Sequence, residues 1–475
     1  MREIETPPPP PRLLPAAGES GADVRGPALR SQIFITLSRT FEFLLFVEIF
    51  VGGFIALGPL FNVNGDSSDK NLMYPIRTVT SVAILVFLLA ARGLIPINLR
   101  VGVVFAYAGL LAASALWSPD PASTFRSAFD FLIFLADVLL LTSALPLTRV
   151  VNVLINVLAL TCTLSFLLAV FLPTYGTAGR DSVWTTDQVG AWRGVFAEKN
   201  GLGGTALIAV LTMITYWRYW TPPVLVRAAA LLCSVACLVL SRSANPIVGG
   251  AFALALAALL GRRPGVIRVV ASMIVAGTIA AIIVLTPAVG AVLALIGRDP
   301  GFNGRSGIWS TAIEFWQQKW WLGHGYVAGT TKDLEPVLLR TIGSSARHSH
   351  SNYLEALVET GTVGFVLFCL VLVVGLFNVC YRPWDVSVED RRSTRALFFV
   401  IASSIEMAGG DVTPLRLVGG WGAVSWAAIL TSLTLFQFRV SPDEPAALRA
   451  MDFAASAGGD AAPAHKTVPR GPPLV

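Results

Sequence analysis

The chain has 475 residues, of which 54% are hydrophobic and only 13% are charged. Soluble domains average about a quarter charged residues, so the composition excludes an ordinary soluble protein and indicates a membrane protein. The net charge of +6 does not require a nucleic-acid partner, because Lys and Arg gather in the cytoplasmic loops of membrane proteins. The five Cys lie in or beside apolar runs and show no metal-ligand or disulfide spacing.

Both ends of the chain are rich in Pro, Ala, Gly and charged residues. Such segments cannot bury enough apolar surface to fold, so we expect disordered tails at 1–35 and 439–475. A run of five Pro, from Pro7 to Pro11, stands where a signal peptide would have its apolar core, so no cleavable signal is expected.

Between the tails, over 36–438, apolar runs of about 17 to 25 residues predict membrane-spanning helices. There are about twelve such runs, which predicts an all-α polytopic membrane protein. The predicted segments are 40–61, 78–95, 100–117, 127–146, 150–173, 200–217, 223–241, 245–261, 268–297, 353–380, 394–409 and 416–438. The segment from 268 is long enough to tilt or to continue beyond the membrane.

Lys and Arg fall unevenly on the alternate loops between these segments. One set of short loops carries Arg92, Arg100, Arg149, Arg218, Arg227, Arg262, Arg263, Arg268, Arg382, Arg391, Arg392 and Arg395. By the positive-inside rule this set, and both termini with it, is cytoplasmic. The polar loop at 298–352 is then expected to face outward, which in a Gram-negative cell means the periplasm, with the protein in the inner membrane.

The loop at 298–352 holds three of the chain's four His. Apolar residues recur at helical spacing from Ile308 to Trp320, which predicts an amphipathic helix within the loop. This helix could lie along the membrane interface, where Trp is favoured, or could pack over the transmembrane bundle without binding a ligand.

His348 and His350 would share one face of an extended segment, which suggests a zinc site. No Cys or external carboxylate cluster supplies the remaining ligands, however, and no nucleophile elbow suggests a catalytic triad. General-base catalysis fits better, because an imidazole outside the membrane is mostly neutral near pH 7 and can take a proton from an attacking hydroxyl.

Three Arg fall on the same external side as the His pair: Arg193, Arg242 and Arg305. Guanidinium groups suit bidentate binding of phosphate or pyrophosphate. An Arg at the end of a membrane-spanning helix can, however, also anchor that helix at the membrane interface. No carboxylate cluster suited to Mg²⁺ stands out in the loop, so we expect Arg rather than a metal to balance the charge of a phosphate.

Charged residues also lie within predicted spanning segments, where they are costly and suggest a function. They are Glu42, Glu48, Asp130, Asp137 and Glu406. Glu406 lies close to the external face and could join an external cavity.

Two motifs in the loop carry a resemblance to a known family. His350-Ser351 is followed at fixed spacing by Gly361-Thr362-Val363-Gly364, and Gly304-Arg305-Ser306-Gly307-Ile308-Trp309 precedes it. With the Trp321-Leu322-Gly323-His324-Gly325 turn, they resemble the O-antigen ligase and Wzy-type polymerase superfamily of bacterial surface polysaccharide assembly.

A further stretch adds detail. Trp192-Arg193-Gly194-Val195-Phe196-Ala197-Glu198-Lys199-Asn200-Gly201 resembles the ExoQ-like exopolysaccharide-production branch, in which this corner opens a helix. The resemblance covers about 190–380. One departure is Ala244-Asn245-Pro246, where family members often have further Ser, Thr or Arg, so Arg242 matches less securely than Arg305 or His350.

The resemblance implies a GT-C-like, metal-independent inverting glycosyltransferase that needs no cofactor and has its catalytic loop at 298–352. It implies His350 and Arg305 as catalytic residues. It implies a substrate site made of Arg193, Lys199, Asn200, Arg242, His348, Asn352 and Glu355. The implied partners are an undecaprenyl-pyrophosphate-linked glycan, an acceptor glycan and membrane lipids, with chain-length regulator and export proteins as further candidates.

The function favoured by this resemblance is polymerisation of lipid-linked repeat units into exopolysaccharide. An O-antigen ligase, which transfers polymer to lipid A core, is the alternative within the same fold. A transporter or flippase would also need about twelve helices, but no inverted repeat is evident and a large outer loop with His and Arg is unusual for that class.

Overall fold

The computed structural model describes residues 25–53, 73–92, 98–179, 189–196, 198–260, 305–343, 348–380, 387–410 and 422–434. Within these ranges the chain is helical, and the extended residues are confined to an isolated bridge between Thr177 and Trp192. The predicted all-α class is therefore confirmed for this part of the chain. The predicted segment at 268–297 and the tail at 439–475 lie outside the described residues.

Every predicted spanning segment except 268–297 overlaps a helix, as far as its residues are described. These helices are α1 (Arg25–Gly53), α3 (Met73–Arg92), α4 (Leu99–Ala113), α5 (Pro121–Ala144), α6 (Leu147–Phe171), α8 (Lys199–Tyr216), α9 (Val224–Leu240), α10 (Asn245–Leu260), α15 (Asn352–Cys380), α16 (Val388–Met407) and α17 (Gly422–Thr434). Several helices begin earlier than predicted. The largest difference is at α1, which begins at Arg25, inside the predicted tail 1–35, whereas α16 begins at Val388 and not at 394.

The predicted count of about twelve spans is not confirmed. Within the part of the chain that the structure describes, four helical stretches are long and apolar enough to cross a bilayer alone. A fifth span is obtained if α9 and α10, between which the chain bends by 119°, form one broken span. With 17 and 16 residues, α9 and α10 each fall short of the roughly 20 residues that a straight span needs.

The outer faces of the helices are apolar, as expected for a protein in lipid. On α9 the side chains of Leu225 and Leu232 are 83% and 70% exposed, whereas Ser234 on the same helix is buried. A soluble protein would place these residues the other way round. Small residues let the helices approach closely inside the bundle, and Gly203 of α8 lies against Pro246 of α10.

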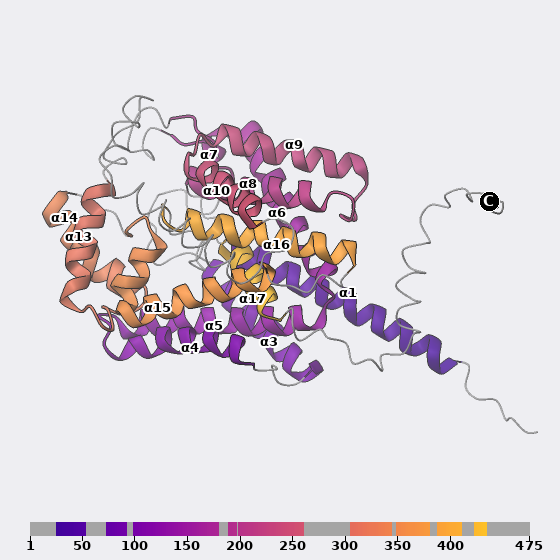
Figure 1. The fold of residues 1–475 in the computed structure, drawn as a ribbon, viewed down its shortest axis with the longest axis horizontal. Coiled ribbons are helices and arrows are strands. Elements are labelled where there is room, and N and C mark those ends of the chain that lie inside the picture. Colours follow the sequence, from indigo (N-terminus) through magenta and orange to yellow (C-terminus); the bar gives the residue numbers. More distant parts are fainter. Residues whose placement is uncertain are drawn as a thin grey trace, which may run out of the picture.

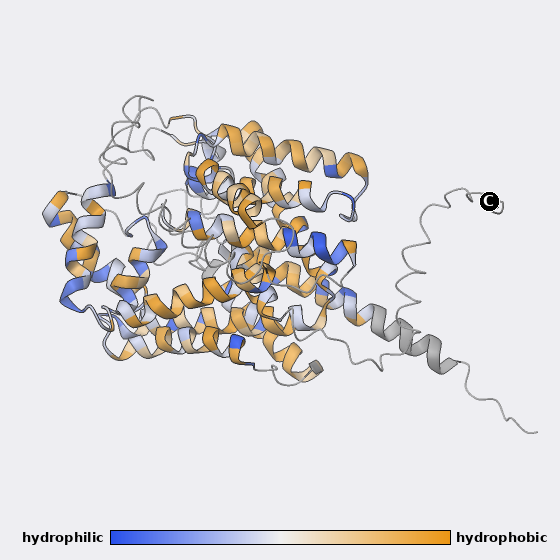
Figure 2. Cartoon of the chain, viewed as in Figure 1, coloured by the Kyte–Doolittle hydropathy of each residue, from blue (hydrophilic) through white to orange (hydrophobic). Residues whose placement is uncertain are grey.

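Hydrogen bonds between loops show which of them lie together at the same end of the bundle. At one end Thr221 N–H donates to Asn152 Oδ1 (3.2 Å), and the Tyr216 hydroxyl donates to Glu389 Oε1 (3.1 Å). Arg149, Arg218 and Arg391 of the Arg set predicted to be cytoplasmic lie at this end. Arg262, Arg263, Arg268 and Arg382 of that set lie outside the described residues. Figure 2 shows hydrophilic residues at the start of α16 there. The predicted alternation of loops and the assignment of this end to the cytoplasm remain predictions.

At the opposite end, the described part of the loop at 298–352 forms three short helical segments: α13 (Arg305–Gln318), η5 (Gly329–Leu334) and α14 (Glu335–Ile342). They lie together beside the start of α15 (Figure 1). The predicted helix in this loop is confirmed as α13, and it packs over the bundle by burying Ile308, Ala312 and Phe315 with Val358 of α15.

Candidate functional site

The turn that carries His350 is held in place by its neighbours. The backbone N–H and hydroxyl of Ser349 both donate to Glu355 Oε1, the hydroxyl at 2.9 Å. From the other side, Trp309 Nε1 of α13 donates to the Ser349 carbonyl (3.0 Å). His350 itself has a φ of +56°, in the left-handed region. Because Glu355 is buried and binds this turn, it acts as a support for His350 as well as a candidate substrate contact.

The end of α16 joins the same site through residues 407–410, here called the α16 turn. The N–H of Asn352 donates to the Ala408 carbonyl (2.9 Å), and Arg305 Nη1 donates to the Gly410 carbonyl. Arg305, at the start of α13, is therefore anchored close to the first residues of α15. It is near enough to His350 for its charge to influence that imidazole.

The two imidazoles of the predicted site lie against each other. The ring centroids of His348 and His350 are 4.2 Å apart, with an interplanar angle of 78°. Burial first, and then the neighbouring His348 and Arg305, lower the pKa of His350 to about 3, against a smaller opposing effect of Glu355. His350 is therefore neutral at pH 7 and able to accept a proton. Among the described residues no third His, Cys or acidic side chain joins the pair in a metal-binding group.

The remaining predicted site residues form a second group at the same end of the bundle. The Trp192 N–H donates to the Leu240 carbonyl (2.9 Å), which places Arg193 next to the turn after α9. The Ser243 hydroxyl donates to Asn200 Oδ1 (2.6 Å) and so ties Arg242 to the start of α8, where Lys199 also lies.

The side chains of this group differ in what they can offer a ligand. Arg193 Nε donates to the Tyr175 carbonyl (2.9 Å), and burial lowers the pKa of Arg193. Arg242 is exposed and has a φ of +51°. Asn200 is engaged by Ser243, so its amide nitrogen is the atom that remains for a substrate contact.

The α16 turn connects the two groups, and the sequence did not predict this role. Asn245 Nδ2 of α10 donates to the Met407 carbonyl (3.1 Å), only two residues beyond Ser243. Asn245 also lies directly against Gly410, whose carbonyl accepts from Arg305. The Asn245-Pro246 departure from the family pattern thus has a structural use. The Gly409-Gly410 pair after an apolar helix was the one sequence signal for a turn here.

The Gly-x-x-Gly motif and the Trp-Leu-Gly-His-Gly turn dock onto each other. Gly361 has a φ of +64° and interrupts α15, so the helix predicted from 353 to 380 is two helical pieces. At the break, the Thr362 N–H donates to the Trp320 carbonyl (2.8 Å), and His324 N–H donates to the Val358 carbonyl (2.8 Å). A Cβ at Gly361 would collide with the Trp321 carbonyl, which explains why this position needs Gly.

His324 has a structural role. Its ring stacks on Phe315 with 3.9 Å between centroids, and Nε2 contacts the Phe315 carbonyl at 3.1 Å. Burial lowers the pKa of His324, and Asp333 lies 3.7 Å from Nδ1. Of the three His in the loop, His324 therefore holds α13 and the following turn together.

The charged residues of the first helices do not join this site. Glu42 pairs with Arg149 (2.8 Å) at the opposite end of the bundle, and Glu48 accepts from the Ser81 hydroxyl (2.9 Å). Asp130 accepts from Thr78 (2.9 Å). Glu406, which was expected to lie near the external face, immediately precedes the α16 turn and lies against Gly249 of α10.

Comparison with known proteins agrees with the motifs that the structure brings together. Residues 229–369 match the family described as O-antigen ligase, and this range contains Arg242, Arg305, His350 and Gly361. Over 319 residues the chain is 24% identical to the exopolysaccharide production protein ExoQ of Rhizobium meliloti (strain 1021), an alignment that covers 63% of this chain and 69% of that protein. The predicted resemblance to the O-antigen ligase family and to ExoQ-like exopolysaccharide-production proteins is therefore confirmed.

Proposed function

We propose that the protein is a membrane glycosyltransferase that joins undecaprenyl-pyrophosphate-linked oligosaccharide repeat units into an exopolysaccharide. The observation that carries the proposal is the neutral imidazole of His350 beside the guanidinium group of Arg305 at one end of an apolar helix bundle. Sugar transfer from a pyrophosphate donor requires two groups in the enzyme: a base and a group that binds the anionic leaving group.

In the proposed reaction an acceptor hydroxyl attacks the anomeric carbon of the donor sugar. A glycosidic C–O bond forms, the bond from that carbon to the pyrophosphate oxygen breaks, and the hydroxyl proton passes to the His350 imidazole. The pyrophosphate leaves with the bonding electron pair, and Arg305 stabilises its charge, with Arg242, Arg193 and Lys199 as further cations. A single displacement of this kind inverts the anomeric configuration, and the Arg residues take the role that a metal has in other transferases.

The low pKa of His350 belongs to the protein without substrate. A bound pyrophosphate would offset the positive charge of Arg305 and place negative charge near the imidazole, and both effects raise the pKa of His350. The donor would thereby turn a weakly basic imidazole into an effective base. This couples the base to the presence of the leaving group.

Transfer of finished polymer to lipid A core is the second candidate, and the match to the O-antigen ligase family supports it. The similarity to an exopolysaccharide production protein favours the polymerase. A transporter or flippase is less well supported, because neither function needs a base held beside an anion-binding Arg.

Disruption of the gene, followed by extraction of lipid-linked glycans and gel analysis, separates these functions. For a polymerase, we expect single lipid-linked repeat units to accumulate on the periplasmic side and long surface chains to disappear. Complete polymer on its lipid carrier would instead identify a ligase. Repeat units trapped on the cytoplasmic side would identify a flippase and contradict the proposal.

The proposed setting is the bacterial inner membrane, with about twelve spans over 36–438, both termini cytoplasmic and the loop at 298–352 periplasmic. Support comes from the location of Arg149, Arg218 and Arg391 at the bundle end opposite His350. The proposed partners are the lipid-linked donor, the acceptor glycan and membrane lipids. Chain-length regulator and export proteins are further candidates.

The pH dependence of the reaction follows from the lowered pKa of His350. Since kcat/KM reports the free enzyme, we expect it to stay level from pH 8 to pH 5, because an imidazole with a pKa of about 3 remains neutral there. We expect kcat to fall at a higher pH than kcat/KM does, because bound pyrophosphate raises the pKa. Initial rates in membrane vesicles supplied with lipid-linked repeat units measure both. An acid limb of kcat/KM near the ordinary His value of about 6.5 would contradict this prediction.

A further inference from the structure

Two side chains of α13 reach the His350 site from the same face of that helix. Arg305 and Trp309 are four residues apart, a spacing that makes them neighbours on a helix surface. Arg305 Nη1 donates to the Gly410 carbonyl, and Trp309 Nε1 donates to the Ser349 carbonyl at 3.0 Å. One helix therefore contacts both the α16 turn and the residue that precedes His350.

Contacts at the far end of α13 fix where this helix lies. The His324 ring stacks on Phe315 with 3.9 Å between centroids, and Nε2 of His324 contacts the Phe315 carbonyl at 3.1 Å. Phe315 also packs with Val358 of α15 in the small core beneath α13. A side chain on a helix that is held in this way is placed more precisely than one on a loop, so the position of the Trp309 indole is well defined.

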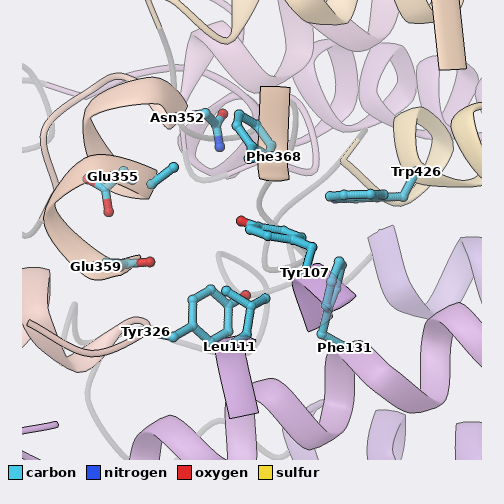
Figure 3. Close-up of a pocket in the computed structure, with 10 residues that line it drawn as sticks. Tyr107, Leu111, Phe131, Tyr326, Asn352, Glu355, Glu359, Phe368 and Trp426 are labelled. Atoms are coloured by element: carbon cyan, nitrogen blue, oxygen red, sulfur yellow. The ribbon is translucent and has the colours of Figure 1, made fainter. Parts of the chain in front are cut away.

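The other side of the His350 turn is supported by α15. The N–H and the hydroxyl of Ser349 both donate to Glu355 Oε1, the hydroxyl at 2.9 Å. Figure 3 shows Glu355 and Glu359 on the first piece of α15, where they and Tyr107 are among the residues that line a small cavity. The turn is thus held between α15 on one side and the indole of Trp309 on the other.

The hydrogen bond from Trp309 acts directly on the backbone of His350. The Ser349 carbonyl belongs to the planar peptide group that joins Ser349 to His350, and φ of His350 describes the rotation of this group about the following N–Cα bond. That φ is +56°, in the left-handed region, which is unfavourable for a residue with a Cβ and persists where the surroundings hold it. A donor fixed on the Ser349 oxygen therefore restrains the rotation that sets the direction of the imidazole.

We propose that Trp309 is a positioning residue, whose indole N–H holds the peptide group between Ser349 and His350 so that the imidazole stays beside Arg305. The proposal rests on the proposed glycosyl transfer, because it takes His350 as the base and Arg305 as a ligand of the leaving group. In this arrangement α13 sets the distance between the two groups, since it carries Arg305 and positions His350. Trp309 acts through the turn and needs no contact with either substrate.

Trp309→Phe tests the role of the indole, with Trp316→Phe as the matched control. Trp316 lies on the same helix, and its Nε1 donates to the Trp320 carbonyl at 3.1 Å, so each variant loses one hydrogen bond from an indole to a backbone carbonyl. In membrane vesicles supplied with lipid-linked repeat units, we expect Trp309→Phe to lower kcat by about ten- to a hundredfold and to leave KM unchanged, because the base is displaced while the substrate contacts remain. Trp316→Phe should leave both unchanged. Equal kinetics in the two variants overturns the proposal.

An isostere separates the hydrogen bond from the bulk of the ring. Benzothienylalanine has the shape of Trp, with sulfur in place of the N–H, and is introduced at position 309 by amber suppression. We expect Trp309→benzothienylalanine to lose kcat as Trp309→Phe does. Full kcat in the isostere variant would show that packing, and not the indole N–H, places the base, and this result contradicts the proposal.

NMR of ring-labelled His in the full-length protein, reconstituted in nanodiscs, monitors the turn without any reaction. The chain has four His, so the spectrum is simple, and the signal of His350 is identified by its loss in His350→Asn. The signal of His324 should stay the same in Trp309→Phe and in Trp316→Phe, because its contacts with Phe315 depend on neither indole. It thereby reports that α13 remains packed.

The titration of His350 is the deciding readout. Burial, then His348 and Arg305, lower the pKa of His350, and Glu355 opposes them. When the turn is released, water reaches the imidazole, so we expect the pKa of His350 in Trp309→Phe to rise toward the ordinary value of about 6.5. It should stay low in the control variant. An unchanged pKa of His350 in Trp309→Phe overturns the proposal.

The two readouts separate this proposal from the proposed function. If His350→Ala still polymerises while Trp309→Phe shifts the titration of His350, the transferase mechanism fails and the hold of Trp309 on the turn stands. If His350→Ala stops polymerisation while Trp309→Phe and Trp316→Phe behave alike in both measurements, the positioning role fails and the transferase stands.

Discussion

Replacement of His350 by Ala is expected to lower the rate of polysaccharide chain formation by about 10²–10⁴-fold, the range that a positioned general base contributes. Without the imidazole, the acceptor hydroxyl has no neutral base beside the pyrophosphate-binding Arg305. The measurement is complementation of a deletion strain, with gel analysis of surface polysaccharide and quantification of single lipid-linked repeat units. Long chains at normal levels would show that His350 is not the base.

His350→Asn is the variant that separates loss of the base from damage to the turn. His350 has a φ of +56°, a conformation that Asn tolerates better than Ala does. We therefore expect His350→Asn to preserve the turn and still to be inactive, because an amide cannot take the proton. His348→Ala removes the adjacent ring. We expect this variant to lower the rate of chain formation by less than about tenfold, since a single imidazole suffices as base.

Replacement of Gly361 by Ala is expected to have the largest structural effect. Its φ of +64° and ψ of −167° form a combination that is strained for any side chain. The added Cβ would also meet the Trp321 carbonyl, which belongs to backbone and cannot simply rotate away. We expect the free energy needed to open the contact between the turn at 320–325 and α15 to fall by about 3 kcal/mol. Hydrogen exchange at His324, Gly325 and Thr362 should then be roughly a hundredfold faster.

Gly102→Ala serves as the control for Gly361→Ala. Gly102 lies inside α4, and a Cβ there would meet nothing within 4 Å. Ala is favoured over Gly inside a helix by up to about 1 kcal/mol, so this variant should be as stable as the original or slightly more so. If the amide hydrogens exchanged at the same rates in Gly361→Ala as in Gly102→Ala, the contact between the Gly-x-x-Gly motif and the turn at 320–325 would not depend on the glycine conformation.

Helix positions could be read from the sequence because each depends on a local property. A run of apolar residues about as long as a bilayer is thick forms a helix whatever its neighbours are, since lipid satisfies no backbone hydrogen bonds. The ends were predicted within a few residues for helices such as α6 and α9. The interruption of α15 was not predicted, because it depends on the docked turn at 320–325, far away in sequence.

The candidate site shows the same division. The sequence by itself determined which residues could carry the chemistry. His350 stands at a fixed spacing before the Gly-x-x-Gly motif, and Arg305 stands shortly before Ile308-Trp309, and both are local patterns. Only the tertiary structure decided that the α16 turn links Arg305 to Asn245, and that Tyr107 shares a cavity with Glu359. These contacts join residues from different helices. Their partners are set by packing within the bundle, and no local pattern in the chain encodes them.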